Sequence, residues 1–170
     1  MGGDDQVVLV NARDEVTGTM EKLQAHREGA LHRAVSVVIT NARGQMLLQR
    51  RAWGKYHSPG LWANAACTHP YLDEDPAIAA QRRLWQEMGL RAELEPLFTF
   101  TYRAELDRGL IEHELDHVFQ GVTDQDPRPD PAEVAAFRWV SPSILRAEMR
   151  RDPDCFAPWF LMIARRMGDG

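Results

Sequence analysis

Apolar stretches separated by polar turns predict several short strands along this chain. Residues 31–40 carry the strongest strand signal, because this run is β-branched and nearly apolar. Residues 41–44 predict a turn that returns the chain into a second strand at residues 45–50, so that the two strands form a hairpin. Other strands are predicted at residues 6–10, 61–66, 94–102, 110–119 and 133–140. Residues 11–18 and 103–109 have the polar composition of turns.

One segment, at residues 76–89, has the spacing and the end signals of a longer helix. Asp75 is a good N-cap, Pro76 fits the first helical position, and Gly89 supplies the C-terminal stop. The apolar positions that recur at helical spacing and should pack inward are Ala77, Ala80, Leu84 and Met88. Shorter helices are predicted at residues 21–26, closed by Gly29, and at residues 141–150 and 159–167.

The order of these elements predicts the fold class. Mixed strands with a helix after the central pair indicate an α/β (α+β) protein, built as an α/β/α sandwich around a mixed β-sheet. A chain of 170 residues is long enough for one core, and no internal repeat or low-complexity tract divides it. The proline-rich acidic stretch at residues 124–132 is too short to link two domains. We therefore expect a single domain over residues 1–170.

Charge and composition narrow the class of partner. The formal net charge of −5 argues against nucleic acid as the main partner. No apolar run is long enough to span a bilayer, and the first residues, Met1 to Gln6, lack the pattern of a secretory signal. The two cysteines, Cys67 and Cys155, are therefore expected to be free thiols in a reducing, cytoplasmic compartment.

Cys67 and His69 bring a thiol and an imidazole together at the end of a predicted strand. They are two residues apart, so in an extended segment they project from the same face, and Pro70 then ends strand pairing. One interpretation makes Cys67 a small buried hydrophobe and His69 a surface loop residue. The other makes the pair part of a functional site. These two residues alone leave both interpretations open.

Residues 110–119 carry three carboxylates on one face of a predicted strand. By alternation, Glu112, Glu114 and Asp116 share that face, whereas His113 and His117 lie on the other. Three carboxylates on one face repel one another unless they meet water or cations. The face is therefore either exposed to solvent or part of a metal site.

Cationic side chains gather in residues 50–59, immediately before Cys67. Arg51 and Lys55 lie there, together with Arg50 and His57. A solvated loop would explain this composition. An anion clamp would explain it as well, because Arg offers a planar fork of donors and Lys a point charge, both suited to phosphate.

The helix and the segment before it resemble the signature of the Nudix family, Gly-x5-Glu-x7-Arg-Glu-U-x-Glu-Glu-x-Gly-U, where U is a bulky apolar residue. The matching positions are Glu74, Arg82, Leu84, Glu87, Gly89 and Leu90. Thr68, Arg83 and Gln86 replace a glycine and two glutamates. Nudix hydrolases hold divalent cations with these carboxylates, so the resemblance implies a Nudix scaffold with a dismantled hydrolytic site. Alone, Arg83 and Glu87 could form a surface ion pair.

Nearly the whole chain resembles the type 1 isopentenyl-diphosphate isomerase family, which has the Nudix fold. The matching residues, in chain order, are Glu21, Lys22, His26, His32, Arg50, Arg51, residues 59–62, Asn64, Cys67, Thr68, His69, Arg82, Arg83, Glu87, Met88, Gly89, Tyr102, Glu112, His113, Glu114 and Trp159. Any one match is weak, and the ordered set is specific.

The resemblance implies a metal centre and a proton-transfer pair. Three histidines and two glutamates would bind one divalent metal of manganese, zinc or magnesium type: His26, His32, His69, Glu112 and Glu114. Cys67 and Glu114 would transfer protons, with the thiolate as a base and Tyr102 assisting near the carboxyl group. Glu87 would help hold a magnesium ion that arrives with the substrate diphosphate. The remaining histidines are expected to lie outside the ligand set: His57, His113 and His117.

The resemblance also implies the substrate site and the reaction. The residues that would bind the diphosphate are Lys22, Arg51, Lys55 and Arg83, and Trp159 would form a wall of the hydrocarbon pocket. The implied activity is the interconversion of isopentenyl and dimethylallyl diphosphate, by protonation and deprotonation, in isoprenoid biosynthesis. The expected partner is thus a small homoallylic or allylic diphosphate, bound by a monomer or weak dimer that binds neither nucleic acid nor membrane.

Three other functions are weighed against this one. A Nudix diphosphohydrolase would depend on the signature carboxylates that Arg83 and Gln86 replace. A noncatalytic Nudix-fold binding module would need no matched thiol and carboxylate. A cysteine hydrolase would need Cys67 and His69 to point at each other, but side chains two apart on a strand point in parallel.

Overall fold

The computed structural model describes residues 5–168, which form nine strands and four α-helices. The strands are β1 (Gln6–Val10), β2 (Val16–Glu21), β3 (His32–Thr40), β4 (Met46–Arg51), β5 (Trp62–Ala63), β6 (Ala66–Thr68), β7 (Glu95–Glu105), β8 (Ile111–Val122) and β9 (Val134–Val140). The helices are α1 (Lys22–Glu28), α2 (Pro76–Met88), α3 (Pro142–Arg151) and α4 (Pro158–Gly168), with short 3-10 turns at Asp107–Gly109 and Pro153–Cys155. Residues 1–4 and 169–170, which the single-domain and N-terminal predictions include, lie outside the described residues.

Strand β3 is the centre of a mixed sheet. It runs parallel to β8 along its whole length, from the pair His32–Glu114 to the pair Thr40–Val122. It is antiparallel to β6 and meets β1 at one position, while β7 continues the sheet beyond β8. Strands β5 and β9 pair with β4. The predicted mixed sheet is therefore confirmed.

The predicted hairpin between β3 and β4 forms only at its turn. The two strands share a single pair, Thr40 with Met46, and then diverge. Strand β3 continues along β8 and β6, whereas β4 turns away to pair with β9 and β5. Their distant partners, which lie far along the chain, separate the two strands and open the sheet between them.

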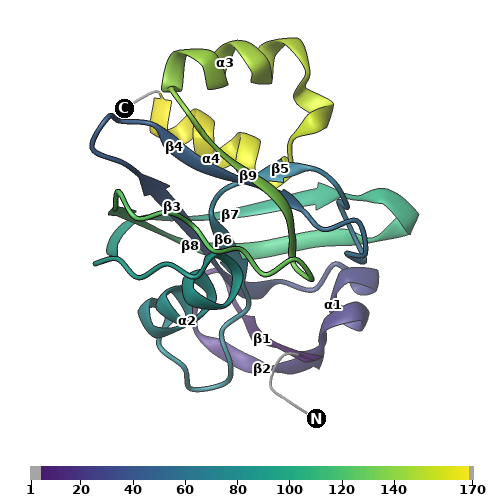
Figure 1. The fold of residues 1–170 in the computed structure, drawn as a ribbon. Coiled ribbons are helices and arrows are strands. Elements are labelled where there is room, and N and C mark those ends of the chain that lie inside the picture. The colour runs from purple at the N-terminus through teal and green to yellow at the C-terminus, as the bar shows by residue number, and fades with distance from the viewer. Residues whose placement is uncertain (1–4, 169–170) are drawn as a thin grey trace.

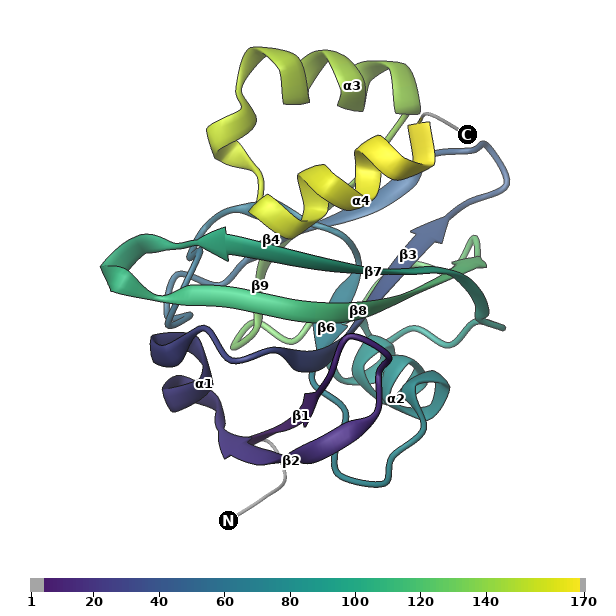
Figure 2. The ribbon, with the colours of Figure 1, turned by 180° about the vertical axis from the view of Figure 1, so that it is seen from behind.

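Helices cover both faces of the sheet, as Figure 1 shows, with α3 and α4 on one side and α2 on the other. Alternate residues of β3 face the two layers: Val38 packs in a cluster with Phe160 of α4, and Val37 packs in one with Leu84 of α2. Seen from behind, β7 and β8 run side by side between these layers, and β1 and β2 lie beside α1 (Figure 2). The predicted α/β/α sandwich is confirmed.

The ends of α2 follow the local sequence signals. The Asp75 side chain accepts a hydrogen bond from the backbone N–H of Ala77 at 2.8 Å, and Pro76 opens the helix. Gly89 has φ +62°, and a Cβ there would lie 2.9 Å from the Arg128 carbonyl oxygen, so glycine is required for conformation and for space. Ala80, Leu84 and Met88 are fully buried, as expected, and Ala77 is partly buried.

Three boundaries differ from the sequence predictions. Residues 16–18, predicted as the end of a turn-rich connection, begin β2, which was not predicted because this mostly exposed edge strand has no apolar run to mark it. Residues 103–105 extend β7, since β8 supplies their backbone partners. The strand predicted at residues 61–66 is split into β5 and β6 by Asn64, whose side-chain amide donates to the carbonyl oxygens of Val37 and Ala66. Among residues 5–168, no helix combines the length and the apolar character needed to cross a membrane.

Candidate active site and metal centre

A cavity of about 430 Å³ lies where β3, β6 and β8 meet the segment that follows β4. Both Cys67 and Glu114 line it, so the predicted proton-transfer pair shares one cavity. The other predicted site residues that line it are Lys22, Arg51, Lys55, His69, Arg83, Glu112 and Trp159. The sequence reasoning thus located half of the residues that line this cavity.

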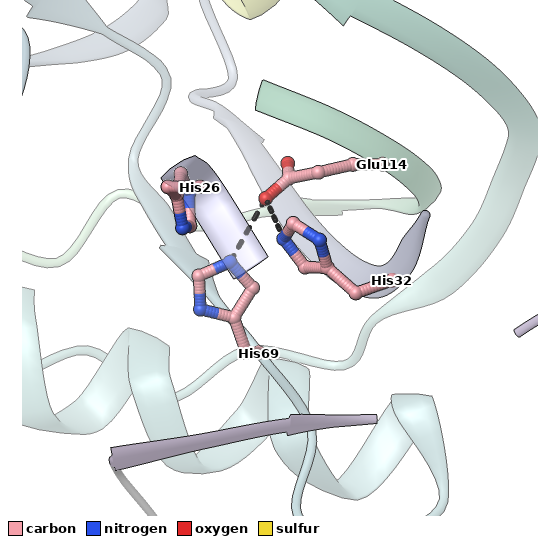
Figure 3. Close-up of side chains that lie close together, drawn as sticks. All are labelled: His26, His32, His69 and Glu114. Carbon is pink, nitrogen blue, oxygen red and sulfur yellow. Dashed lines mark hydrogen bonds and ion pairs between the residues drawn. The ribbon is translucent and has the colours of Figure 1, made fainter. Parts of the chain in front are cut away.

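Three histidines and one glutamate converge beside the cavity, as Figure 3 shows. Their possible ligand atoms all lie within 4.8 Å of one another, and they come from four separate parts of the chain: His26, His32, His69 and Glu114. The parallel register of β3 and β8 sets His32 directly beside Glu114. His69 arrives from the end of β6, which pairs with the other edge of β3. The fold therefore assembles four of the five predicted metal ligands.

Backbone carbonyls orient two of these imidazole rings. Nδ1 of His26 lies 2.8 Å from the Lys22 carbonyl oxygen, and Nδ1 of His32 lies 2.9 Å from that of Ala30. A carbonyl oxygen only accepts, so each Nδ1 carries the proton and donates. In the neutral rings the free lone pair is then on Nε2, which faces the cluster. Metal-binding histidines are commonly oriented in this way, by a hydrogen bond from the ring nitrogen that does not bind the metal.

The contacts of Glu114 fit a cation. One of its oxygens, Oε2, lies 2.9 Å from Nε2 of His32 and 2.8 Å from Nε2 of His69. An imidazole lone pair and a carboxylate oxygen at this distance repel unless a proton or a cation lies between them. Buried imidazoles and a carboxylate are donors that divalent ions of zinc or manganese type accept. The residues present therefore fit a divalent metal.

The protonation equilibria of the cluster agree with this fit. Burial lowers the pKa of His26, and burial lowers the pKa of His69 to about 4, so both rings are neutral at pH 7. Burial alone would lower the pKa of His32, but the Glu114 carboxylate raises it overall. Burial alone would raise the pKa of Glu114, but Nε2–H groups of His32 and His69, present when these nitrogens carry a proton, donate to Glu114 and hold its pKa well below its usual range. Neutral imidazole and ionised carboxylate are the forms that bind metal.

Glu112 belongs to a neighbouring group of donors. It is buried, and its ligand atom lies within 4.8 Å of those of His26 and His57. The Tyr102 hydroxyl donates to Oε1 of Glu114 at 2.6 Å and also contacts Oε1 of Glu112, so it lies between the two carboxyl groups. Burial, then the charge of Glu114, raises the pKa of Glu112 well above its usual range.

His57, which was expected to lie outside the ligand set, is buried beside the carboxylates of the site. Its ring is 5 % exposed, and Nε2 lies 3.5 Å from Oε2 of Glu112. The segment before β5 folds back over α1, so that the Tyr56 hydroxyl also lies 3.3 Å from Nε2 of His26. No periodic pattern marks this loop, so the sequence could not show the contact. His113 and His117 do point elsewhere, to the Gly29 carbonyl oxygen and to Asp14.

The Cys67 thiol lines the same cavity as His69. Its Sγ is 3.7 Å from the Ser36 hydroxyl and 3.3 Å from Nδ2 of Asn64. Burial, then the charges of Asp116 and Glu87, raises the pKa of Cys67 to about 12. The raised pKa favours a neutral thiol at pH 7; the thiolate that the resemblance implies as a base would form when this thiol gives up its proton.

Asp116 is linked to this thiol through the Ser36 hydroxyl and does not face solvent. It is 1 % exposed, and its Oδ2 accepts a hydrogen bond of 2.7 Å from the Ser36 hydroxyl. Strand β3 carries Ser36 between β6 and β8, which explains how residues 80 positions apart meet. Since Glu112 and Glu114 are buried too, the exposed-face interpretation of this strand is wrong.

Trp159, at the start of α4, closes the apolar side of the cavity. The side chain is 3 % exposed, and its indole N–H donates to Oδ1 of Asn64 at 3.2 Å. The Arg51 guanidinium lies 5.0 Å from the indole centroid and donates to the carbonyl oxygens of His57 and Ser58. Arg51 thus braces the loop as well as lining the cavity.

Cations at the mouth of the cavity share a carboxylate that sequence reasoning missed. The side chains of Lys55 and Arg83 both contact Oε2 of Glu133, which lies just before β9. Arg83 also donates to Oε2 of Glu87 at 3.2 Å, and Glu87 accepts from the Cys67 backbone N–H at 3.2 Å. Glu87 is 3 % exposed, so this is not a surface ion pair.

Comparisons with known proteins agree with the fold and with the predicted family. The NUDIX domain family matches residues 30–160. The isopentenyl-diphosphate Delta-isomerase of Pectobacterium atrosepticum is 51% identical over 164 residues, which cover 96% of this chain and 92% of the relative. That of Serratia proteamaculans is 44% identical over 97% of this chain and 92% of its own length. This chain belongs to the isopentenyl-diphosphate Delta-isomerase family.

A solved structure supports the NUDIX fold independently. The Deinococcus radiodurans protein DR0079 superposes with a TM-score of 0.80 over 95% of this chain and 98% of its own. Its sequence identity is 21%, so this likeness concerns the fold alone. The isopentenyl-diphosphate Delta-isomerase family membership confirms the resemblance inferred from the ordered set of residues.

Proposed function

We propose that this protein interconverts isopentenyl diphosphate and dimethylallyl diphosphate by adding a proton at one carbon and removing one at another. The relatives that share its length carry the name of this isomerase. The observation that carries the proposal is the shared cavity, which Cys67 and Glu114 both line together with the indole of Trp159. A binding module or a hydrolase would not need this pair.

The reaction explains why the cavity needs these groups. An isolated alkene is a very weak base, and its protonation produces a tertiary carbocation-like species that water would capture. The site must therefore supply an acid, an opposed base and a water-poor pocket. Trp159 offers an aromatic face that can stabilise a transient cation by ~0.5–2 kcal/mol. Its hydrogen bond to Asn64 holds that ring in place.

The proposed acid and base differ in their environments. The pKa of Cys67 is raised, so the thiol holds a proton, and the pKa of Glu114 is lowered, so the carboxylate can accept one. Two titratable groups with shifts of opposite sign are the usual basis for dividing acid and base roles. The reaction is reversible, so the two groups exchange roles with its direction. Tyr102 donates to Glu114 and would hold that carboxylate in position.

A divalent ion would be held by His26, His32, His69 and Glu114, with Glu112 from the adjoining group. We propose manganese, zinc or magnesium, because a mixed imidazole and carboxylate set suits ions of this class. When bound, the ion would neutralise the carboxylate and make a proton on it easier to release. Glu87 is proposed to help hold a magnesium ion that accompanies the diphosphate.

The diphosphate is proposed to bind at the cationic mouth of the cavity. The four cationic side chains on this wall are Lys22, Arg51, Lys55 and Arg83. Lys55 and Arg83 contact Glu133 in the free protein. A diphosphate carries more charge than one carboxylate and more acceptor oxygens, so it would compete for both cations. The cations thus favour a small anionic substrate.

Two further properties remain proposals. We propose that the protein works in the cytoplasm, which is supported by the free state of both Cys67 and Cys155. We also propose that it acts as a monomer or a weak dimer on a small molecule, without nucleic acid or membrane. The cation-lined cavity supports the small-molecule partner.

Proton NMR of isopentenyl diphosphate incubated with the protein in heavy water tests the reaction. We expect double-bond migration together with deuterium uptake, and no release of phosphate. Cys67→Ala and Glu114→Gln should each abolish both signals, while Cys155→Ala, which removes the exposed thiol, should not. Ordinary turnover by Cys67→Ala would refute the assigned pair, and free pyrophosphate in the phosphorus spectrum would indicate a hydrolase instead.

A further inference from the structure

Glu133 lies in the wall between two cavities. One is the cavity of about 430 Å³ that Cys67 and Glu114 line. The other has a volume of about 930 Å³ and is lined by the C-terminal turns of α2 and by the segment before β9. Among residues 5–168, Glu133 and Arg83 alone line both cavities. The Glu133 carboxylate therefore has space on either side of its present position.

The backbone of Glu133 is held in place, but its side chain is not buried. Its N–H donates to the carbonyl oxygen of Asp130 at 2.9 Å, and its carbonyl oxygen accepts from the N–H of Ala52 at 3.1 Å. The side chain is 30 % exposed. A side chain of this kind can change rotamer without any movement of the backbone. The carboxylate can therefore leave its partners and remain in contact with water.

In the free protein this carboxylate occupies two of the four cations at the cavity mouth. Its Oε2 contacts Nζ of Lys55 and lies 3.1 Å from Nη2 of Arg83. No carboxylate within the described residues forms an ion pair with the other two cations, Lys22 and Arg51. The mouth thus has one pair of cations that Glu133 already neutralises and one pair that it leaves free.

The position of Oε2 is one that a phosphate oxygen would also take. An oxygen that accepts from an ammonium and a guanidinium has the charge and the hydrogen bonds of a terminal phosphate oxygen. Lys55 and Arg83 cannot bind the carboxylate and a phosphoryl group at the same place. Partly exposed ion pairs are weak, so a ligand with several anionic oxygens can displace the carboxylate. The contacts that Glu133 loses then oppose binding.

We propose that Glu133 is an internal competitor of the diphosphate, which leaves Lys55 and Arg83 and turns towards the second cavity when the substrate binds. This inference rests on the proposed diphosphate site, and it gives Glu133 a role in affinity rather than in proton transfer. Substrate and product carry the same diphosphate. The same competition therefore weakens the binding of both and favours release of the product once the double bond has moved.

Isothermal titration calorimetry with methylenediphosphonate, a diphosphate analogue that cannot be hydrolysed, tests this at a fixed Mg²⁺ concentration. Glu133→Gln keeps the shape of the side chain and removes its charge. The dissociation constant of the analogue should fall by about three- to tenfold, because two partly exposed ion pairs no longer compete. A role in holding the fold alone would not tighten binding. If Glu133→Gln does not fold, Glu133→Ala serves in its place.

Glu148→Gln is the matched control. It also removes a carboxylate that pairs with an arginine, Arg138 on β9, but Glu148 lines neither cavity. Its dissociation constant for methylenediphosphonate should equal that of the wild type. Equal tightening in this control and in Glu133→Gln would show a general effect of net charge and would overturn the proposal.

A double-mutant cycle with Lys55→Met tests the competition itself. In the wild type, Lys55 gives up Glu133 when it binds the analogue, so its removal costs only the difference between the two contacts. In the Glu133→Gln protein, the same removal costs the whole contact with the analogue. Lys55→Met should therefore weaken binding by a factor at least about threefold larger in the Glu133→Gln background. Equal factors in the two backgrounds would refute the competition.

The isomerase assay adds a second readout. Glu133→Gln should lower KM without raising kcat, because the diphosphate is bound in the ground state and in the transition state alike. Unchanged or weaker binding of methylenediphosphonate by Glu133→Gln, as expected if Glu133 only positions the cations or binds the magnesium ion, would overturn the proposal, and so would no binding by any variant. The calorimetry needs no turnover, so failure of the isomerase assay is distinguishable from failure here.

Discussion

Cys67 and Glu114 line the same cavity but have different neighbours: carboxylates lie near Cys67, and imidazoles contact Glu114. Cys67 is close to the carboxylates of Asp116 and Glu87, which add to the effect of burial and favour the neutral thiol. Glu114 accepts hydrogen bonds from imidazoles, which favour the carboxylate. At the scale of the residue, these environments favour a protonated Cys67 and an ionised Glu114, which can accept a proton.

The thiol environment predicts how Cys67 reacts with an alkylating reagent. Only the thiolate reacts, and a pKa of about 12 keeps its fraction small until high pH. In a Cys155→Ala protein, the iodoacetamide rate at Cys67 should rise about tenfold per pH unit between roughly pH 7 and 10 without a plateau. Mass spectrometry of timed samples measures this. A plateau below pH 9, with circular dichroism showing a folded protein, would contradict the raised pKa.

Tyr102 is predicted to stabilise the fold through the two carboxylates that it bridges. Tyr102→Phe removes the buried hydroxyl that donates to Glu114 and contacts Glu112. The expected loss is about 1–3 kcal/mol in the free energy of unfolding, together with slower isomerisation. Urea denaturation measures the first effect. Tyr56→Phe is the control, because it removes one longer contact of 3.3 Å, to Nε2 of His26, and should cost less.

The site residues that could be identified from the sequence are those that match the isomerase family in chain order. Cys67 and Glu114 were identified in this way, and the structure places both at one cavity. Ser36 and Glu133 were missed, because each acts through a contact with a distant part of the chain. Ser36 meets Asp116 across 80 positions, which no local pattern records.

Among the elements, those with local signals were predicted best. Helix α2 begins and ends where its caps require, because Asp75 and Gly89 act within one turn of the helix. The hairpin of β3 and β4 was predicted from its turn, but its opening was not, since β8 and β9 draw the strands apart. Edge strand β2 was missed because half-exposed strands carry little hydrophobic pattern.

A comparison of two glycines tests how α2 is held. Gly89 and Gly44 both have positive φ, +62° and +75°, but only Gly89 lies against another segment, at Arg128. Gly44→Ala should cost roughly 1–2 kcal/mol of stability, the usual cost of a left-handed residue. Gly89→Ala should cost clearly more, because its Cβ would lie 2.9 Å from backbone oxygen. Thermal unfolding of both variants checks this, and equal losses would show that the close approach has no energetic effect.

At the scale of the molecule, the candidate metal centre joins helix α1 to three segments that the sheet already brings together. His26 comes from α1, His32 from β3, His69 from the chain after β6, and Glu114 from β8. Helix α1 contributes a buried ring to the cluster but has few neighbours of its own beyond β1, β2 and β8. An ion bound by all four residues would cross-link α1 to the centre of the sheet.

The metal is therefore predicted to raise the stability of the whole fold. An ion that binds only the folded state at 100 times its dissociation constant adds about 2.7 kcal/mol to the free energy of unfolding, and each kcal/mol raises the Tm of a chain of this size by roughly 2–4 °C. Differential scanning calorimetry should show the Tm of chelator-treated protein rise by roughly 5–10 °C when Mn²⁺ is restored. His69→Ala should lose most of this shift, because a ring that contacts Glu114 is removed. His117→Ala should keep it, because that ring contacts Asp14 on the other face of β8. An unchanged Tm after verified Mn²⁺ addition would mean that the ion does not join these segments.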